Sequence, residues 1–125
     1  MITVSPIKDA EEIKRIFKEQ NIEYCKNSGC VTAKQGDEVL GKCLYNLDEK
    51  CMTILYIEPK DDIMLLDGIL RSTLHIATER SIMKATYVDT SFESVFETLK
   101  FIKDKPSRTL DTDRLFGGCE CNKNE

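Results

Sequence analysis

The stretch KCMTILYI at residues 50–57 decides the fold, together with the helical run that follows it at residues 62–80. The first segment is apolar on both of its faces, which carry Met52, Ile54 and Tyr56 on one side and Cys51, Leu55 and Ile57 on the other. A strand that is apolar on both faces is typical of the middle of a sheet. Pro59 ends this strand, and the helical run places apolar side chains on one face at Ile63, Leu66, Leu70, Leu74 and Ala77. Residues 84–88 (KATYV) form a further strand, so the pattern predicts a right-handed strand-helix-strand crossover.

The segments before this crossover indicate antiparallel strands. Residues 30–35 and 38–46 flank Gly36-Asp37, which is a plausible hairpin turn, and a second turn at residues 46–49 leads into the central strand. At the start of the chain, residues 2–7 (ITVSPI) read as a strand whose Pro6 favours an edge position. Asp9 then opens an amphipathic helix with Glu12 three residues later, the spacing of a capping box.

After the crossover, Thr90 and Glu93 have the spacing that caps another helix. Its apolar positions are Phe92, Val95, Phe96, Leu99 and Ile102. Residues 104–125 are polar, apart from Leu115-Phe116, which suggest a last strand. The fold class is therefore α/β (α+β), with a mixed, mostly antiparallel sheet and helices on both faces. The sheet should splay between 50–57 and 84–88, where the pairing becomes parallel, and ligands often bind at such a point.

Composition limits the classes of function. The chain has 125 residues, a net charge of −4 and 41% hydrophobic residues, so it suits one globular domain, which we place at residues 1–118, followed by a polar tail at 119–125. Without a basic block it is a poor candidate for nucleic-acid binding. No apolar run is long enough to span a bilayer and no signal peptide is visible, so we expect a cytoplasmic location and no membrane partner.

Three segments resemble the Gcn5-related N-acetyltransferase (GNAT) family. GILRSTLHIATER (68–80) followed by KATYV (84–88) resembles the long helix of that family and the strand after it. VFETLKF (95–101) resembles the family's last helix, which usually reads Leu-Tyr-Glu-Lys-Leu-Gly-Phe. The resemblance covers roughly residues 2–103 and implies a divergent GNAT-like fold, with acetyl-CoA as co-substrate and a small-molecule or peptide amine as acceptor.

The resemblance also implies where acetyl-CoA would bind. GNAT members hold the pyrophosphate on backbone N–H groups at the start of the long helix, within an Arg/Gln-x-x-Gly-x-Gly/Ala segment. In this chain the segment falls on DDIMLL (61–66), with Met64 and Leu66 in place of glycines and Asp61 in place of the Arg or Gln. The expected cofactor-binding residues are Tyr56, Ile57, Ile63, Met64, Leu65, Leu66 and Asp89, the last at a position where an Asn often touches the pantetheine arm. Two carboxylates at a helix start favour, from the residues alone, a well-capped helix.

The catalytic positions depart from the family as well. Phe96 stands where many members carry a tyrosine that protonates the leaving thiolate. Glu58 matches a site where some members place a carboxylate base, and it is our candidate catalytic residue; the alternative is a solvated charge at the rim of the sheet. Tyr56 and Tyr87 could each supply a hydroxyl or simply fill the core.

Six cysteines are unusual in a chain without an export signal. Cys25, Cys43 and Cys51 suit small apolar core positions, and Cys30 is undecided at a turn. Cys119 and Cys121 form a Cys-x-Cys pair, whose spacing falls short of the usual zinc pattern, so we assign no metal site. His75, the only histidine, suits a partly exposed helix position.

Two hypotheses of function follow. The first is an acyl-CoA-dependent N-acetyltransferase that transfers an acyl group to an unidentified amine. The second is a catalytically degenerate GNAT-fold binding or interaction module, with a metal- or thiol-active variant through the C-terminal cysteine pair. Met64, Leu66 and Phe96 favour the second, and the order of the elements favours the first.

Overall fold

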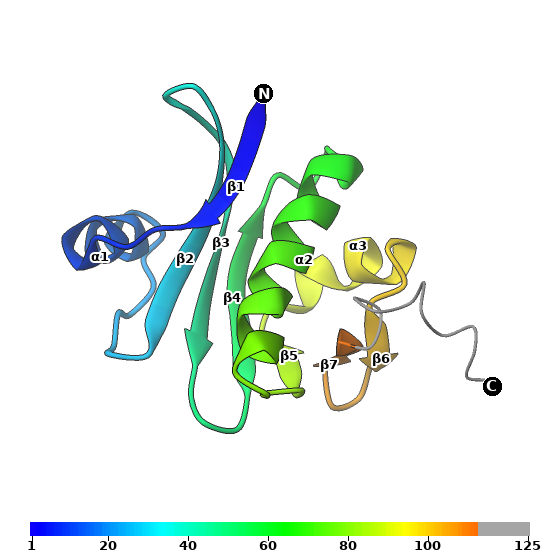
Figure 1. Cartoon of the computed structure of the whole chain (residues 1–125). Helices are drawn as coiled ribbons and strands as arrows, with labels where there is room; N and C mark the ends of the chain where they lie inside the picture. Colours follow the sequence, from blue (N-terminus) through cyan, green and yellow to red (C-terminus); the bar gives the residue numbers. More distant parts are fainter. Residues whose placement is uncertain (113–125) are drawn as a thin grey trace.

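A single seven-stranded sheet organises the chain, in a computed structural model that describes residues 1–112 (Figure 1). The predicted strand at Leu115-Phe116, the end of the domain at residue 118 and the cysteine pair in the tail lie outside the described residues. The strands lie in the order β1-β2-β3-β4-β5-β7-β6. Their bounds are β1 Ile2–Pro6, β2 Ser28–Gln35, β3 Glu38–Leu47, β4 Met52–Glu58, β5 Ala85–Tyr87, β6 Ile102–Asp104 and β7 Thr109–Leu110. Strand β1 is at the edge, as Pro6 predicts.

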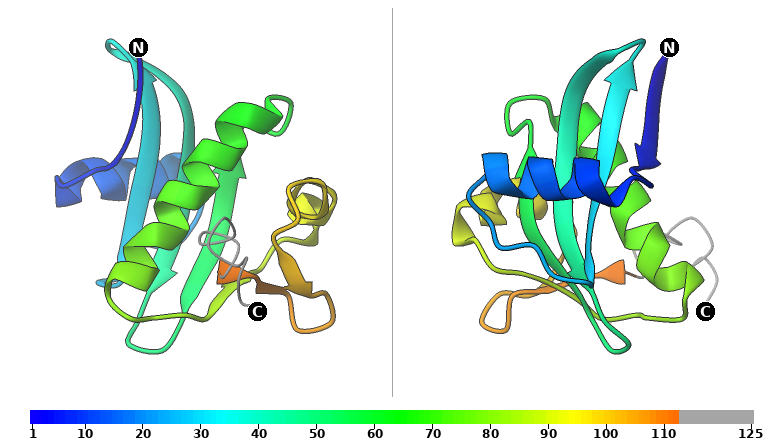
Figure 2. Two further views of the ribbon diagram at one scale, coloured as in Figure 1. Left: turned by 45° about the vertical axis from the view of Figure 1, so that its right-hand side comes forward. Right: turned by 90° about the vertical axis from the view of Figure 1, so that its left-hand side faces the viewer.

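Helices cover both faces of this sheet, as predicted (Figure 2). They are α1 Ala10–Glu19, α2 Ile63–Glu79, the 3-10 turn η1 Thr90–Phe92 and α3 Glu93–Thr98. Helix α1 packs Ile13, Ile16 and Phe17 on Cys30 and Leu44. Helix α2 packs on the opposite face, where it forms the larger core with β2 to β5 and α3. Within residues 1–112, no helix is both long and apolar enough to cross a membrane.

The predicted splay lies between β4 and β5. These two strands run parallel but pair at only three positions, from Met52↔Ala85 to Ile54↔Tyr87. Strand β4 continues to Glu58 beyond the last pair, and its register with β3 shifts between Leu44 and Tyr45. Such an irregularity bends a strand away from its neighbour. The last four residues of β4 therefore diverge from β5, while β3 still pairs with most of them.

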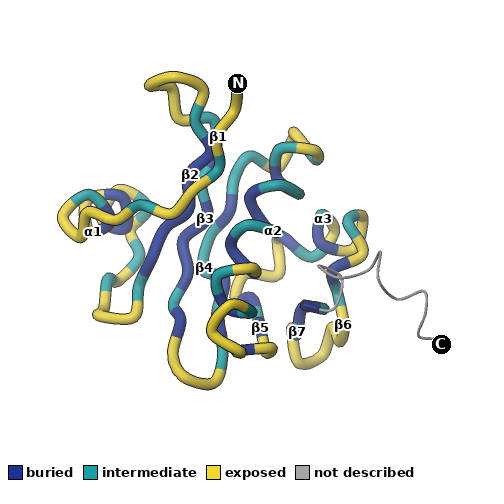
Figure 3. Tube along the Cα trace, viewed as in Figure 1, coloured by how far each residue is buried: buried dark blue, intermediate teal, exposed yellow. Residues whose placement is uncertain are grey.

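Burial follows the predicted pattern for most elements. Figure 3 shows buried backbone along the middle of the sheet and on one side of α2. In α2 the buried set is Leu66, Ile69, Leu70, Thr73, Leu74 and Ala77, which matches the predicted stripe except that Ile63 is only half-buried.

Three expectations were wrong in detail. Asp89, rather than Thr90, caps the turn before α3, since its carboxylate accepts from the Ser91 N–H at 2.9 Å. Helix α3 ends at Thr98, and Ile102, which was predicted on that helix, begins the short strand β6. The segment from residue 104, which was predicted to be polar without a strand before Leu115, contains the short strand β7. Cys25 is exposed instead of filling the core, because its thiol lies beside the polar groups of Ser28 and Asn46.

Candidate functional site at the splayed end of the sheet

Glu58 is the centre of a polar cluster at the end of β4. Its Oε1 accepts a 2.5 Å hydrogen bond from the Tyr56 hydroxyl, two residues earlier on the same face of the strand. Its Oε2 lies 3.9 Å from Lys42 Nζ on the neighbouring strand β3. The Glu58 side chain is 35% exposed and the Lys42 side chain 15% exposed, so the cluster is half-buried but open to solvent. The hydrogen bond to Glu58, followed by burial, raises the pKa of Tyr56 to about 12, so the phenol keeps its proton at neutral pH.

The register of the sheet explains how these groups come together. Thr32 pairs with Lys42, and Lys42 with Glu58, so three strands present one polar row on the same face. Helix α1 covers the neighbouring part of that face. Cys30 lies close by, and its burial raises the pKa of its thiol to about 12, against the opposing effect of Lys42. A protonated thiol is a poor nucleophile, so Cys30 is not the reactive group of this face. The groups available for chemistry are the Glu58 carboxylate, the Lys42 amine and the Tyr56 phenol.

The start of α2 is a capped helix end, as the two aspartates predict. The Asp62 carboxylate accepts from the Leu65 N–H at 3.1 Å, and the Asp62 carbonyl accepts from the Leu66 N–H at 2.9 Å. Within residues 1–112, only the N–H groups of Ile63 and Met64 in this turn lack an acceptor. An anion at this helix start would therefore have to displace a carboxylate or share the remaining two donors with it.

The predicted cofactor-binding residues divide into three groups by position. Ile57 and Leu66 are fully buried in the core that α2 covers, so their side chains are unavailable to a ligand. Met64 is 81% exposed, and Ile63 and Leu65 are partly buried around it. The Asp89 carboxylate is used by the Ser91 N–H, which also holds the pKa of this aspartate below its usual range. Only Tyr56 is brought to Glu58.

One contact across the splay was missed by the sequence. Lys60, in the loop after β4, reaches the Ser91 hydroxyl at 3.2 Å and lies 4.6 Å from the centroid of the Phe92 ring. Phe92 also packs edge-on against Tyr56, with ring centroids 6.1 Å apart. A cation and two aromatic rings thus connect the diverging end of β4 with η1. No short-range pattern signals this contact, because Lys60 and Phe92 are far apart in the sequence.

Phe96 and Tyr87 form the inner wall of the same region. Phe96 is fully buried, and its ring packs edge-on against Tyr87 at 5.3 Å. The Tyr87 hydroxyl donates to Glu93 Oε2 at 2.7 Å, and burial together with this hydrogen bond raises the pKa of Tyr87 to about 12. Tyr87 therefore fills the core, with its hydroxyl committed to Glu93. His75, as expected, is exposed, and its Nε2 lies 3.4 Å from Glu79 Oε2.

No group of three or more potential metal ligands occurs within residues 1–112. Cys30 and Cys43 are buried, and desolvation raises the pKa of each thiol to about 12. Metal binding requires deprotonated thiols, so these two cysteines are core residues.

The strand order, the splay after three parallel pairs and the long helix behind it define the GNAT fold, and comparison with solved structures shows the same class. An IAA acetyltransferase from Bacillus cereus superposes with a TM-score of 0.58 at 17% identity, covering 79% of this chain and 75% of that one. A GNAT family acetyltransferase from Elizabethkingia anophelis with acetyl-CoA bound gives 0.56 at 16% identity, covering 82% and 78%.

A larger protein contains the same fold as one part. N-acetylglutamate synthase from Neisseria gonorrhoeae, complexed with coenzyme A and N-acetyl-glutamate, gives a TM-score of 0.60 at 12% identity, covering 99% of this chain and 33% of that one. No protein-family profile and no curated protein sequence matches the chain. These structural similarities show the fold, and the chemistry has to be argued from the site.

The two parts of this region offer different chemistry. At the end of β4, the Glu58 carboxylate lies with the Tyr56 phenol and the Lys42 amine where the strand diverges from β5. The start of α2 does not suit a pyrophosphate, because Asp62 already occupies the Leu65 N–H and Asp61 adds a second negative charge. Lys60 precedes these aspartates in the sequence, and its ammonium is engaged with Ser91 and Phe92.

Proposed function

We propose that this chain is an N-acyltransferase of the GNAT fold, in which Glu58 accepts the proton that an acceptor amine loses. The observation that carries the proposal is the position of Glu58. It ends the central strand where β4 leaves β5, and it is half-exposed between Tyr56 and Lys42. A carboxylate placed beside an amine can act as a general base, an effect typically worth about 10² to 10⁴ in rate.

The two oxygens of Glu58 have different surroundings. Tyr56 donates to Oε1 and fixes the orientation of the carboxylate. Oε2 is 3.9 Å from Lys42, too long for a direct hydrogen bond, so this oxygen retains acceptor capacity for an incoming amine. The amine nitrogen would attack the carbonyl of an acyl thioester, so that the C–N bond forms and the C–S bond breaks. The proton lost by the amine would go to Oε2, and the thiolate would leave as the free thiol after taking a proton from water. The acceptor is a small-molecule or peptide amine that enters over the polar row of Thr32, Lys42 and Glu58.

The acyl donor is expected to be bound mainly through its thioester end. Because the helix start carries negative charge and offers few free N–H groups, the ADP portion of acetyl-CoA should add little affinity. Calorimetric titration with acetyl-CoA and with S-acetylpantetheine tests this expectation, and we expect dissociation constants within about fivefold of each other. Release of free thiol with a panel of amines then tests transfer. If neither thioester binds at millimolar concentration and no amine promotes thiol release, the proposal is wrong.

A second candidate function is a GNAT-fold binding module that has lost acyl transfer. The Asp62 cap favours it, because the residue that would meet a pyrophosphate instead completes the helix, and Phe96 lacks the hydroxyl of the family's tyrosine. The variant that uses Cys119 and Cys121 for thiol or metal chemistry concerns residues outside those described. Metal analysis and thiol titration of the purified full chain would test its metal-binding form, since six freely titrating thiols and no metal would remove that form.

A further inference from the structure

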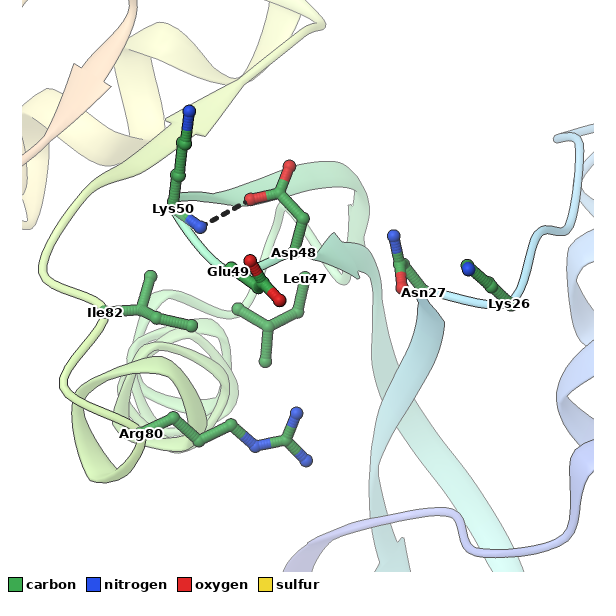
Figure 4. Close-up of a pocket in the computed structure, with 8 residues that line it drawn as sticks. All are labelled: Lys26, Asn27, Leu47, Asp48, Glu49, Lys50, Arg80 and Ile82. Carbon is green, nitrogen blue, oxygen red and sulfur yellow. Dashed lines mark hydrogen bonds between the residues drawn. The ribbon is translucent and has the colours of Figure 1, made fainter.

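A second cavity lies at the opposite end of the sheet from Glu58. It is an open cavity of about 810 Å³ between the end of α2, the β3–β4 turn and the segment before β2. Its lining residues are Lys26, Asn27, Leu47, Asp48, Glu49, Lys50, Arg80 and Ile82 (Figure 4). A smaller pocket of about 190 Å³ shares four of these residues and adds Ser28 and Tyr45. The combined volume is in the range of sites that hold small metabolites.

The smaller pocket is lined by hydrogen-bond donors and contains no carboxylate. Arg80, which caps the C-terminus of α2, forms no ion pair with any residue in the described part of the chain. The side chains of Lys26 and Asn27 likewise have no partner within residues 1–112, although the Asn27 carbonyl accepts from the Leu47 N–H at 2.9 Å. Three donor side chains with unused capacity therefore border one small space.

Tyr45 adds a buried hydroxyl to this group. The residue is only 8% exposed, and none of residues 1–112 forms a hydrogen bond with its hydroxyl. The tip of its ring lies directly on Gly29, where a Cβ atom would come within 2.5 Å of the hydroxyl oxygen. Arg80 and Tyr45 line the same small pocket, and burial raises the pKa of the Tyr45 phenol while the charge of Arg80 lowers it. A buried hydroxyl without a partner is costly, and a bound oxygen acceptor would satisfy it.

The acidic residues of the larger cavity occupy a separate part of it. Asp48 is committed to the turn, since its Oδ1 accepts from the N–H groups of Lys50 at 2.7 Å and Cys51 at 2.8 Å. In Figure 4 the Asp48 carboxylate and the Lys50 ammonium point away from the space in front of Arg80. Glu49 and Ile82 line only the larger cavity, and Leu47 lines both the larger cavity and the smaller pocket.

We propose that this cavity binds a small organic anion, whose carboxylate or phosphate group enters the donor-lined pocket of Arg80, Tyr45 and Asn27 and whose apolar part lies on Leu47 and Ile82. Arginine presents a planar set of donors that matches either anion, and the tyrosine hydroxyl adds a directional contact. Carboxylate and phosphate share this chemistry, so the experiment has one arm for each.

The test is a ¹H–¹⁵N NMR titration of the full chain with benzoate and, separately, with phenyl phosphate. We expect saturable shifts at the amides of Asn27, Leu47 and Arg80, with the tighter probe identifying the preferred anion. Arg80→Gln should weaken binding by about tenfold or more, and Tyr45→Phe by about three- to tenfold, as expected for hydrogen bonds to a charged group. Glu49→Gln should strengthen binding, because it removes a negative charge that lines the cavity.

Arg15→Gln is the matched control. It removes one exposed arginine from α1, where Arg15 pairs with Glu12 and Glu19, and it should leave the affinity unchanged. Absence of saturable shifts at these amides up to about 20 mM of both probes overturns the proposal. Equal weakening by Arg80→Gln and Arg15→Gln also overturns it, because the effect would then be general charge attraction. Arg80 is exposed, so its variant keeps the test decisive even if Tyr45→Phe loses stability.

Discussion

The two ends of α2 carry opposite charges. Asp61 and Asp62 lie at its N-terminus, whereas Arg80 caps its C-terminus and Lys26 borders the same cavity. Each charge lies at the helix end of opposite partial charge, so both stabilise α2 through the helix macrodipole. For a ligand, however, they oppose what the helix alone would offer. The Asp62 carboxylate occupies the Leu65 N–H and leaves two free N–H groups in the first turn, whereas the C-terminal end presents cations without an ion-pair partner in residues 1–112. A helix start attracts anions only where its N–H groups remain free.

The two roles that we propose lie at different ends of one small fold. The splayed end holds the acid, phenol and lysine of the proposed proton transfer, and the end at the β3–β4 turn (the hairpin end) holds the donors of the proposed anion site. The length of the sheet separates them, and β3 contributes to both, with Lys42 at the splayed end and Tyr45 and Leu47 at the hairpin end. Variants at one end should therefore leave the function of the other unchanged, since distant sites usually contribute independently.

The largest expected effect is at Glu58. In the amine-dependent thiol-release assay, Glu58→Gln should lower the rate by about 10² to 10⁴, because the amide cannot accept the proton. Glu79→Gln is the control, since Glu79 is exposed on α2 and its carboxylate lies 3.4 Å from His75. Benzoate or phenyl phosphate binding should be the same in both variants. A Glu58→Gln protein that keeps full activity would show that Glu58 is only a rim charge.

A smaller effect is expected at Gly29, which supports the hairpin end. Gly29→Ala places a Cβ within 2.5 Å of the Tyr45 ring, so the ring must move or the strands must separate. We expect a loss of about 1–3 kcal/mol in the free energy of unfolding, measured with urea. Gly68→Ala is the matched control, because nothing lies within 4 Å of its Cβ position in α2. It should raise stability by about 0.5–1 kcal/mol through helix propensity. Equal stability of the two variants would mean that Tyr45 does not rest on Gly29.

The next effect is a gain in affinity at the start of α2. Asp62→Asn retains a side chain that caps well but removes its charge, so the helix should persist and acetyl-CoA should bind about two- to fivefold more tightly. Asp9→Asn makes the same change at the N-cap of α1, where the Asp9 carboxylate accepts from the Glu11 N–H, and should have no effect. Calorimetric titration measures both. If the Asp62 variant binds acetyl-CoA no better than wild type, its charge is not what limits the affinity.

Features that depend on neighbouring residues were predictable from the sequence. The cap at Asp62 follows from residues within one helical turn, and the splay follows from a parallel crossover attached to antiparallel strands. The Tyr56–Glu58 contact was not predicted, although it could have been, because residues two apart share one face of a strand.

Features assembled from distant segments were not predictable. The hairpin-end cavity joins the segment before β2, the β3–β4 turn and the residue after α2, with no motif in any of them. Strands β6 and β7 have three and two residues, too few for an alternating pattern to show. Cys25 was misassigned because cysteine is usually buried, and only the polar neighbours Ser28 and Asn46 explain its exposure.

The smallest expected effect is on the ionisation of the Tyr56 phenol, at the splayed end, above pH 10. Because Glu58 raises the pKa of Tyr56 from 10 to about 12, the folded protein keeps this phenol neutral while the unfolded chain ionises near pH 10. The Tyr56–Glu58 contribution to stability should therefore be complete below pH 10 and be lost as the pH rises to about 12.

Ultraviolet titration should show a Tyr56 phenol that ionises late, and Glu58→Gln should shift this ionisation towards pH 10. In the Tyr56→Phe variant the late phase should shrink but persist, because the pKa of Tyr87 is also raised to about 12 by burial and by its bond to Glu93. A Tyr56 that titrates near 10 in the wild-type protein would mean that its hydroxyl does not hold Glu58 in the orientation proposed for proton transfer.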